Sequence, residues 1–122
     1  MKFKRELRVE NIRSKIEQIF ESLNFIDETM PVDFNGFENS KIIRNAIYKE
    51  VEFALENILD ICSILNADLM LGIPEVEEDI LINLQKKDVF SKDLIDLIRE
   101  MKKFINILVH KYGKIDDEKA YE

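Results

Sequence analysis

Four polar residues near the C-terminus are spaced to share one side of a helix: Arg99, Lys103, Asn106 and His110. At about 100° per residue, these positions fall within a narrow polar stripe. His110 is the only histidine in the chain, and Tyr112 follows it closely. The residue types leave two interpretations open: metal-free acid–base chemistry by the histidine with cationic help, or a histidine that only balances the dipole at a helix C-terminus.

The opposite side of the same segment is apolar. The residues that fall there are Leu94, Ile98, Met101, Ile105 and Leu108. Ser91 is a suitable N-cap for this helix, and Gly113 suits the position just after its end. The pattern predicts a helix that buries one face and exposes the polar stripe.

Apolar residues at helical spacing predict three further helices, at about 3–29, from Asn39 or Ser40 to about 67, and at about 75–85. We expect Pro31 and Gly36 to break the chain after the first helix, and Gly72 and Pro74 to do so after the second. No stretch alternates as a strand does, and the connections are of modest length. The chain is therefore predicted to be all-α, an antiparallel bundle of four to five helices that forms one domain over residues 1–122.

Composition limits the function. The 122 residues carry a net charge of −7, which argues against nucleic-acid binding over the whole surface. Five Lys or Arg residues against one acidic residue lie between Arg99 and Lys114, so any basic patch coincides with the histidine. The one cysteine, Cys62, lies in an apolar run and is expected to be a buried thiol, as in a reducing cytosol. No apolar stretch has the length of a membrane span, so a cytoplasmic protein is expected.

Several classes of enzyme lack their required parts here. A ferritin-like site needs a Glu three residues before a His, whereas Ile107 precedes His110 at that spacing. One His and one Cys do not make a typical zinc site. The sequence has no glycine-rich phosphate loop and no nucleophile-elbow pattern. We therefore expect neither a metal nor a cofactor.

The segment from Phe104 to Tyr112, read with Gly113 to Asp116, resembles the motif of the HepT group of HEPN proteins, usually written Arg-Asn-x-x-x-His-x-Tyr. Upstream, the residues Val32-Asp33-Phe34, then Arg44, and then the run from Ala54 to Ile61 resemble the second helix of that family. The resemblance covers most of the chain.

The resemblance implies a helical bundle that dimerises with its two motif segments facing each other and cleaves RNA without a metal. It also implies the toxin half of a toxin–antitoxin pair, silenced when an MNT-type nucleotidyltransferase adds AMP to the motif tyrosine. By position, His110 corresponds to the catalytic histidine, Asn106 to the polar residue after the arginine, and Tyr112 to the modified tyrosine.

The chain departs from the motif at Ile105, which occupies the arginine position. Arginine grips two phosphate oxygens and stabilises the charge that develops during cleavage. Loss of such a group typically lowers the rate on the order of 10²- to 10³-fold, so weak or absent activity is expected. Lys103 or Arg99 is a candidate substitute cation, and Lys111 adds charge beside the motif.

Residues 105 and 110 are about 140° apart on an ideal helix, so their side chains converge only through a partner subunit or a break in the helix. The acidic pair Glu56 and Asp60 on the second long helix is either a solvated stripe or a support for the basic motif across the bundle.

Three functions follow from these alternatives. The first is a HepT-type ribonuclease, active or weakened by Ile105. The second is a catalytically dead HEPN module that engages the nucleotidyltransferase and accepts AMP at Tyr112. The third is a plain dimeric scaffold. In addition, Asp116-Asp117-Glu118 resembles the acidic start of another helix, which is either a frayed tail or a truncated final helix.

Overall fold

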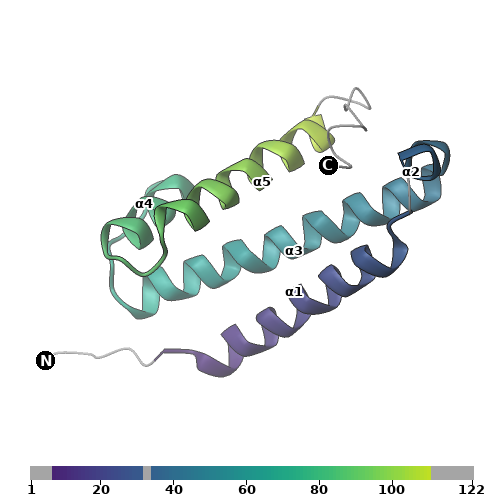
Figure 1. The fold of residues 1–122 in the computed structure, drawn as a ribbon. Coiled ribbons are helices and arrows are strands. Elements are labelled where there is room, and N and C mark those ends of the chain that lie inside the picture. Colours follow the sequence, from purple (N-terminus) through teal and green to yellow (C-terminus); the bar gives the residue numbers. More distant parts are fainter. Residues whose placement is uncertain (1–6, 32–33, 111–122) are drawn as a thin grey trace, which may run out of the picture.

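The computed structural model describes residues 7–31 and 34–110 and forms five α-helices over them (Figure 1). The helices are α1 (Val9–Thr29), α2 (Phe34–Asn39), α3 (Lys41–Asp68), α4 (Glu77–Lys86) and α5 (Lys92–His110). The long helix α3 lies in the middle, and α1 packs along one side of it while α4 and α5 pack on the other. Because α3 runs opposite to both α1 and α5, the predicted antiparallel all-α bundle is confirmed.

The helix starts follow the capping residues. Ser40 precedes α3, and its hydroxyl accepts a hydrogen bond from the backbone N–H of Ile43 at 3.2 Å. Ser91 does the same for α5, where the N–H of Leu94 donates to its hydroxyl at 3.2 Å. Side-chain oxygens at these positions satisfy backbone donors that the helix itself leaves unpaired. Both predicted caps are confirmed.

The expectation that Gly36 interrupts the helical structure was wrong. Gly36 lies inside the short helix α2, which the apolar spacing did not reveal. The side chain of Phe37, one residue later, is 1% exposed, and its ring meets that of Tyr48 edge to face with 5.9 Å between centroids. Burial of one large ring offsets the low helix propensity of a single glycine.

The core lies where α3, α4 and α5 meet. Its fully buried members are Leu55, Cys62, Leu81, Leu84, Ile95 and Ile98. Cys62 is 1% exposed, which confirms the predicted buried thiol. Helix α1 is attached to α3 differently, since it contributes partly buried apolar residues and polar contacts such as that from the Ser22 hydroxyl to Glu50 at 3.0 Å. Among the described residues, no helix is long and apolar enough to cross a membrane.

Candidate functional site

At its described side chains, helix α5 exposes Lys103 and Asn106 and buries most of its opposite face, as predicted, while the side chains of Leu108 and His110 lie outside the described part. Ile98 is 1% exposed, and Met101 and Ile105 pack against the core cluster. One predicted member of the buried face was wrong: Leu94 is 40% exposed, and the neighbouring Ile95 is fully buried in its place. The reason is that the start of α5 turns Ile95 towards the core shared with α3 and α4, so that Leu94 borders an open groove.

The motif positions lie in the last turns of α5. Ile105 is partly buried against the core, whereas Asn106 is exposed. His110 is the last residue of the helix, one turn beyond Asn106 and therefore on the same face. Lys111 and Tyr112, which the sequence analysis placed in the site, lie outside the described residues. The described part of the motif thus combines an apolar side chain directed inward with a polar residue at the surface.

The cations of the stripe are engaged in ion pairs. Arg99 contacts Glu78 of α4 at 2.7 Å and Asp96 at 3.3 Å. Arg99 precedes His110 by three turns, or about 16 Å along the helix at about 1.5 Å per residue. Lys103 is exposed and lies 4.0 Å from Glu100. Arg99 therefore joins α5 to the start of α4, and Lys103 is the candidate cation nearer to the histidine.

Two further ion pairs support the same helix. Lys102 contacts Glu77 at 2.7 Å, which adds a second link between α5 and α4. Lys92 contacts Asp96 at 2.8 Å, one turn apart. The hydrogen bond from Lys92 is the main cause that lowers the pKa of the Asp96 carboxyl. The Lys102 pair joins the middle of α5 to the start of α4, whereas the Lys92 pair lies within the first turns of α5.

The acidic pair that the sequence singled out on α3, Glu56 and Asp60, does not share one environment. Asp60 accepts a hydrogen bond from the ammonium of Lys15 at 3.0 Å, so it lies on the side of α3 that meets α1. Glu56, one turn earlier, is exposed. Neither residue forms an ion pair with a described residue of α5.

An aromatic chain that the sequence analysis did not anticipate holds the motif end of α5. The ring of Phe104 meets that of Tyr48 on α3 edge to face, with 5.8 Å between centroids, and Tyr48 in turn contacts Phe37 of α2. Edge-to-face pairs add to the burial energy of the rings. Since α3 and α5 are antiparallel, this contact brings the start of α3 level with the last turn of α5. Arg44, one turn before Tyr48, is thereby brought to the motif end, where its guanidinium donates to the Glu38 carbonyl.

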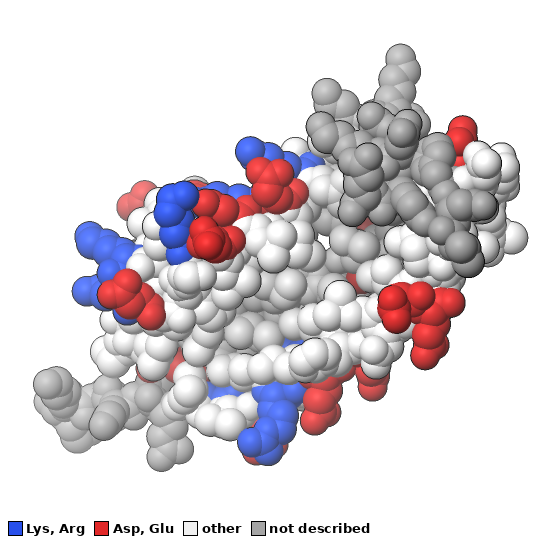
Figure 2. Space-filling model, viewed as in Figure 1, with Lys and Arg blue, Asp and Glu red and all other residues white. Residues whose placement is uncertain are grey.

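An apolar groove separates α1 from α5. These two helices both pack on α3 and their backbones do not approach each other closely, and the groove encloses about 320 Å³. Its walls and floor are Ile12, Ile16, Ile58, Ile61, Leu65, Phe90, Leu94, Leu97, Ile98 and Met101. Large apolar side chains of the same two helices are exposed, among them Phe20 of α1 at 61% and Leu97 of α5, which lines the groove, at 56%. Figure 2 shows this face as largely uncharged, with acidic and basic residues along its edges.

The remaining reactive groups do not form a site. Burial raises the pKa of the Cys62 thiol to about 11, so the thiol is protonated and unreactive at neutral pH. No group of three or more His, Cys, Asp or Glu side chains capable of holding a metal ion occurs within residues 7–31 and 34–110.

The sequence profile of one protein family, described as ribonuclease HepT-like, matches residues 16–122. The chain belongs to this HepT-like family. The match includes α5 and the whole motif from Ile105 to Tyr112, so the resemblance seen in the sequence is confirmed at the level of the family. Among curated proteins, no sequence matches significantly.

Solved structures share the fold of this HepT-like chain. A tri-AMPylated HEPN toxin of Shewanella oneidensis in complex with MNT antitoxin has a TM-score of 0.80 at 23% identity, over 88% of this chain and 80% of that one. A toxin–antitoxin complex with AMP-PNP has a TM-score of 0.81 at 22% identity, over 89% and 82%. The cytosolic protein YutE of Bacillus subtilis, of unknown function, reaches 0.77 at 19% identity, over 96% and 78%. At these identities the likeness establishes the HEPN fold alone.

Proposed function

We propose that this chain is the toxin half of a HepT-type toxin–antitoxin pair and acts in the cytoplasm as a metal-independent endoribonuclease, weakened or inactive because of Ile105. The observation that carries the proposal is the family match over residues 16–122, a range that contains Asn106, His110 and Tyr112, which the motif resemblance assigns to the site. The exposure of Asn106 and the position of His110 one turn further along α5 support a shared polar surface.

The proposed reaction uses the 2′-hydroxyl of RNA as the nucleophile. His110 accepts the proton of this hydroxyl as the 2′-oxygen attacks the adjacent phosphorus. The P–O5′ bond breaks, which leaves a 2′,3′-cyclic phosphate, and the departing 5′-oxygen takes up a proton from water. Charge that builds on the phosphate oxygens needs a cation, which a motif arginine supplies. Ile105 supplies none, and its contact with the core cluster directs it away from solvent. Lys103 is proposed as a partial substitute, since it is exposed on the stripe of His110.

A homodimer is part of the proposal, because an ideal helix separates positions 105 and 110. The groove between α1 and α5 supports it, since exposed apolar patches of this kind usually mark protein contacts. Two copies that meet there would cover the exposed Phe20 and Leu97. Light scattering of a Phe20→Ser, Leu97→Ser double variant is expected to give the mass of one chain, and an unchanged dimer mass would exclude this interface.

We further propose that an MNT-type nucleotidyltransferase serves as the antitoxin and adds AMP to Tyr112. The named complex of an AMPylated HEPN toxin with MNT antitoxin supports this partner. Incubation with the nucleotidyltransferase and ATP is expected to add AMP, detected by peptide mass spectrometry. Tyr112→Phe should abolish the label while Tyr121→Phe keeps it. Labelling that survives Tyr112→Phe contradicts the assignment.

A second function is favoured by one observation, the packing of the partly buried Ile105 against the core cluster. A residue that helps the fold and cannot bind phosphate fits a catalytically dead HEPN module, which still engages the nucleotidyltransferase and accepts AMP. This alternative predicts labelling at Tyr112 without RNA cleavage under any condition.

RNA cleavage in EDTA separates the two functions. A mixture of tRNA and mRNA is incubated with the native chain, with Ile105→Arg and with Ile105→Arg combined with His110→Ala. The ribonuclease proposal expects arginine to raise cleavage on the order of 10²-fold, and the added His110→Ala to abolish it. Ile107→Arg, which adds the same charge at an exposed position nearby, is the matched control and should not raise cleavage. Folded variants that all lack activity favour the dead module.

A further inference from the structure

The loop between α3 and α4 contains a non-glycine residue in a backbone conformation that glycine usually adopts. Met70 has φ of 55°, in the left-handed region, and its N–H donates to the carbonyl of Ala67 while that of Leu71 donates to Asn66. This pattern is a Schellman motif, where glycine or asparagine is usual. After α4 the equivalent position is Asp88 at φ of 57°, a residue type that tolerates the conformation. The need to end the helix therefore does not explain why methionine occupies position 70.

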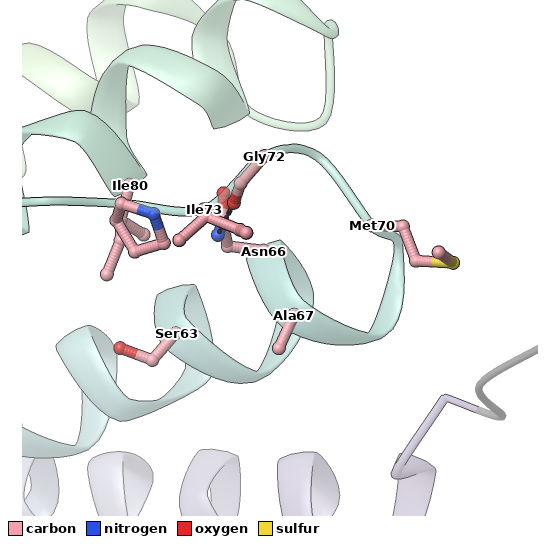
Figure 3. Close-up of a pocket in the computed structure, with 8 residues that line it drawn as sticks. Ser63, Asn66, Ala67, Met70, Gly72, Ile73 and Ile80 are labelled. Atoms are coloured by element: carbon pink, nitrogen blue, oxygen red, sulfur yellow. Dashed lines mark hydrogen bonds between the residues drawn. The ribbon is translucent and has the colours of Figure 1, made fainter.

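The same loop exposes apolar side chains that do not contribute to the core. Ile73 is 96% exposed and Met70 is 70% exposed. Both border a pocket of about 630 Å³, which Figure 3 shows between the last turns of α3 and the segment that leads into α4. The pocket is lined by Ser63, Asn66, Ala67, Met70, Gly72, Ile73, Pro74 and Ile80. An exposed ridge and a hollow thus lie side by side, and we call them the α3–α4 patch.

A buried amide network holds the patch in place. The side-chain amide of Asn66, 3% exposed, donates to the carbonyl of Gly72 at 2.9 Å, and that of Asn83 on α4 donates to Asn66 at 3.0 Å. Gly72 has φ of 137°, and a Cβ there would lie 3.2 Å from the Asn83 amide. The loop is therefore fixed by specific hydrogen bonds, and the exposure of Ile73 is a property of a defined conformation.

One acidic residue adjoins the α3–α4 patch, and another lies two helical turns away from it. Glu75 follows Pro74 directly, and Glu56 lies two turns before Ser63 on the same exposed face of α3. Both are exposed, and neither carboxylate forms an ion pair with a residue in the described part of the chain. The chain as a whole carries a net charge of −7. A partner that covers the patch is therefore favoured electrostatically if it is cationic.

We propose that the α3–α4 patch binds a basic amphipathic segment of a partner protein, which inserts one apolar side chain into the pocket and places Lys or Arg near Glu56 and Glu75. A small molecule would fill the hollow but leave Ile73 in water, whereas a protein segment covers both. Methionine at the outer edge suits this role because its flexible thioether adapts to varied apolar partners. In Figure 1 the α3–α4 loop and the end of α5 lie at opposite ends of the bundle, so this contact is separate from the proposed cleavage site.

The test uses a fluorescent helical peptide of Leu and Lys with one apolar face, and a matched peptide of Leu and Glu. Fluorescence anisotropy is expected to give saturable binding of the Lys peptide alone. Ile73→Ser should weaken it about tenfold or more, as expected for loss of one buried aliphatic side chain. Ile82→Ser, which removes an exposed isoleucine of α4 outside the pocket, is the matched control and should leave the affinity unchanged.

Met70→Gly separates binding from folding. Glycine relieves the left-handed strain, so thermal stability should rise while peptide affinity falls; a rise in stability with unchanged affinity overturns the role of Met70. The whole proposal is overturned if the Lys peptide does not bind, if the Glu peptide binds equally well, or if Ile73→Ser has no effect. Light scattering of Ile73→Ser tests whether a second copy of this chain occupies the patch. A drop to the mass of a single chain would show that it does, which also overturns the proposal.

Discussion

The guanidinium of Arg8 forms a bidentate ion pair with the carboxylate of Asp68, which joins the start of α1 to the end of α3. Its Nε and Nη2 donate to the two oxygens of Asp68 at 2.9 and 3.0 Å, and the backbone N–H of Arg8 donates at 3.0 Å. The side chain of Asp68 is fully buried, while that of Arg8 is about half exposed. The hydrogen bond to Asp68 is also the main cause that raises the pKa of Arg8.

Asp68→Asn is therefore expected to destabilise the bundle. Asparagine keeps the shape but loses the charge and turns one acceptor into a donor that faces the guanidinium. We expect the melting temperature to fall by about 5 °C or more. Asp60→Asn, which breaks the exposed pair with Lys15, is the matched control and should change it little. Equal losses for the two variants, measured by circular dichroism, would contradict a special role for the buried carboxylate.

Two neighbouring residues of α5 test the assignment of its buried face. Ile98 is 1% exposed and Leu97 is 56% exposed. Ile98→Ala should lower the free energy of unfolding by about 2–5 kcal/mol, since it leaves a cavity in the core. For Leu97→Ala we expect less than about 1 kcal/mol in the monomer. Urea titrations at a protein concentration that keeps the chain monomeric measure both values, and similar costs would show that α5 is rotated from its described position.

The sequence predicted α3 and α5 well because their apolar residues recur at helical spacing and their N-caps are serines. Ser40 and Ser91 mark the starts of α3 and α5 by local hydrogen bonds alone, which need no knowledge of the tertiary structure. The burial of Cys62 followed from the same spacing. Local rules thus fixed the two helices that carry most of the core.

Other features depend on contacts between distant segments. The short helix α2 forms around Gly36 because Phe37 packs against Tyr48 of the next helix, α3, a tertiary contact that helical spacing does not reveal. Leu94 was predicted to be buried, but Ile95 is buried in its place because of the way in which α5 packs against α3 and α4. In the candidate site, the sequence placed Asn106 and His110 on one face. The sequence did not predict that Arg99 pairs with α4, because its acidic partner Glu78 is 21 residues away.

Cys62 predicts a loss of stability at alkaline pH. Its pKa is raised by burial to about 11 in the folded chain, whereas an ordinary thiol titrates near 9. Between these two values the unfolded chain releases its proton before the folded chain does, so stability falls as pH rises from about 9 to 11. Urea unfolding should show a smaller fall over this range for Cys62→Ala. Parallel pH profiles of the two proteins would show that the thiol is not the group responsible.

Ile105 links the fold to the proposed activity, because the motif that this segment resembles has an arginine where this chain has a partly buried apolar side chain. Ile105 packs against the cluster formed by Leu55, Cys62 and their neighbours. An arginine there can keep its aliphatic stem on that surface while its guanidinium reaches water, so the fold should survive the substitution. We expect Ile105→Arg to lower the free energy of unfolding by about 1–2 kcal/mol, and Ile107→Arg, at a 39% exposed position, by less than about 0.5 kcal/mol.

This difference has a functional consequence. If Ile105→Arg restores cleavage while it costs stability, then isoleucine trades catalysis for core packing at this position, as expected where activity and stability compete. Urea unfolding and RNA cleavage are measured on the same preparations of both variants. A stable Ile105→Arg variant would contradict the packing described for Ile105. A destabilised variant without cleavage would instead assign the residue to the fold alone.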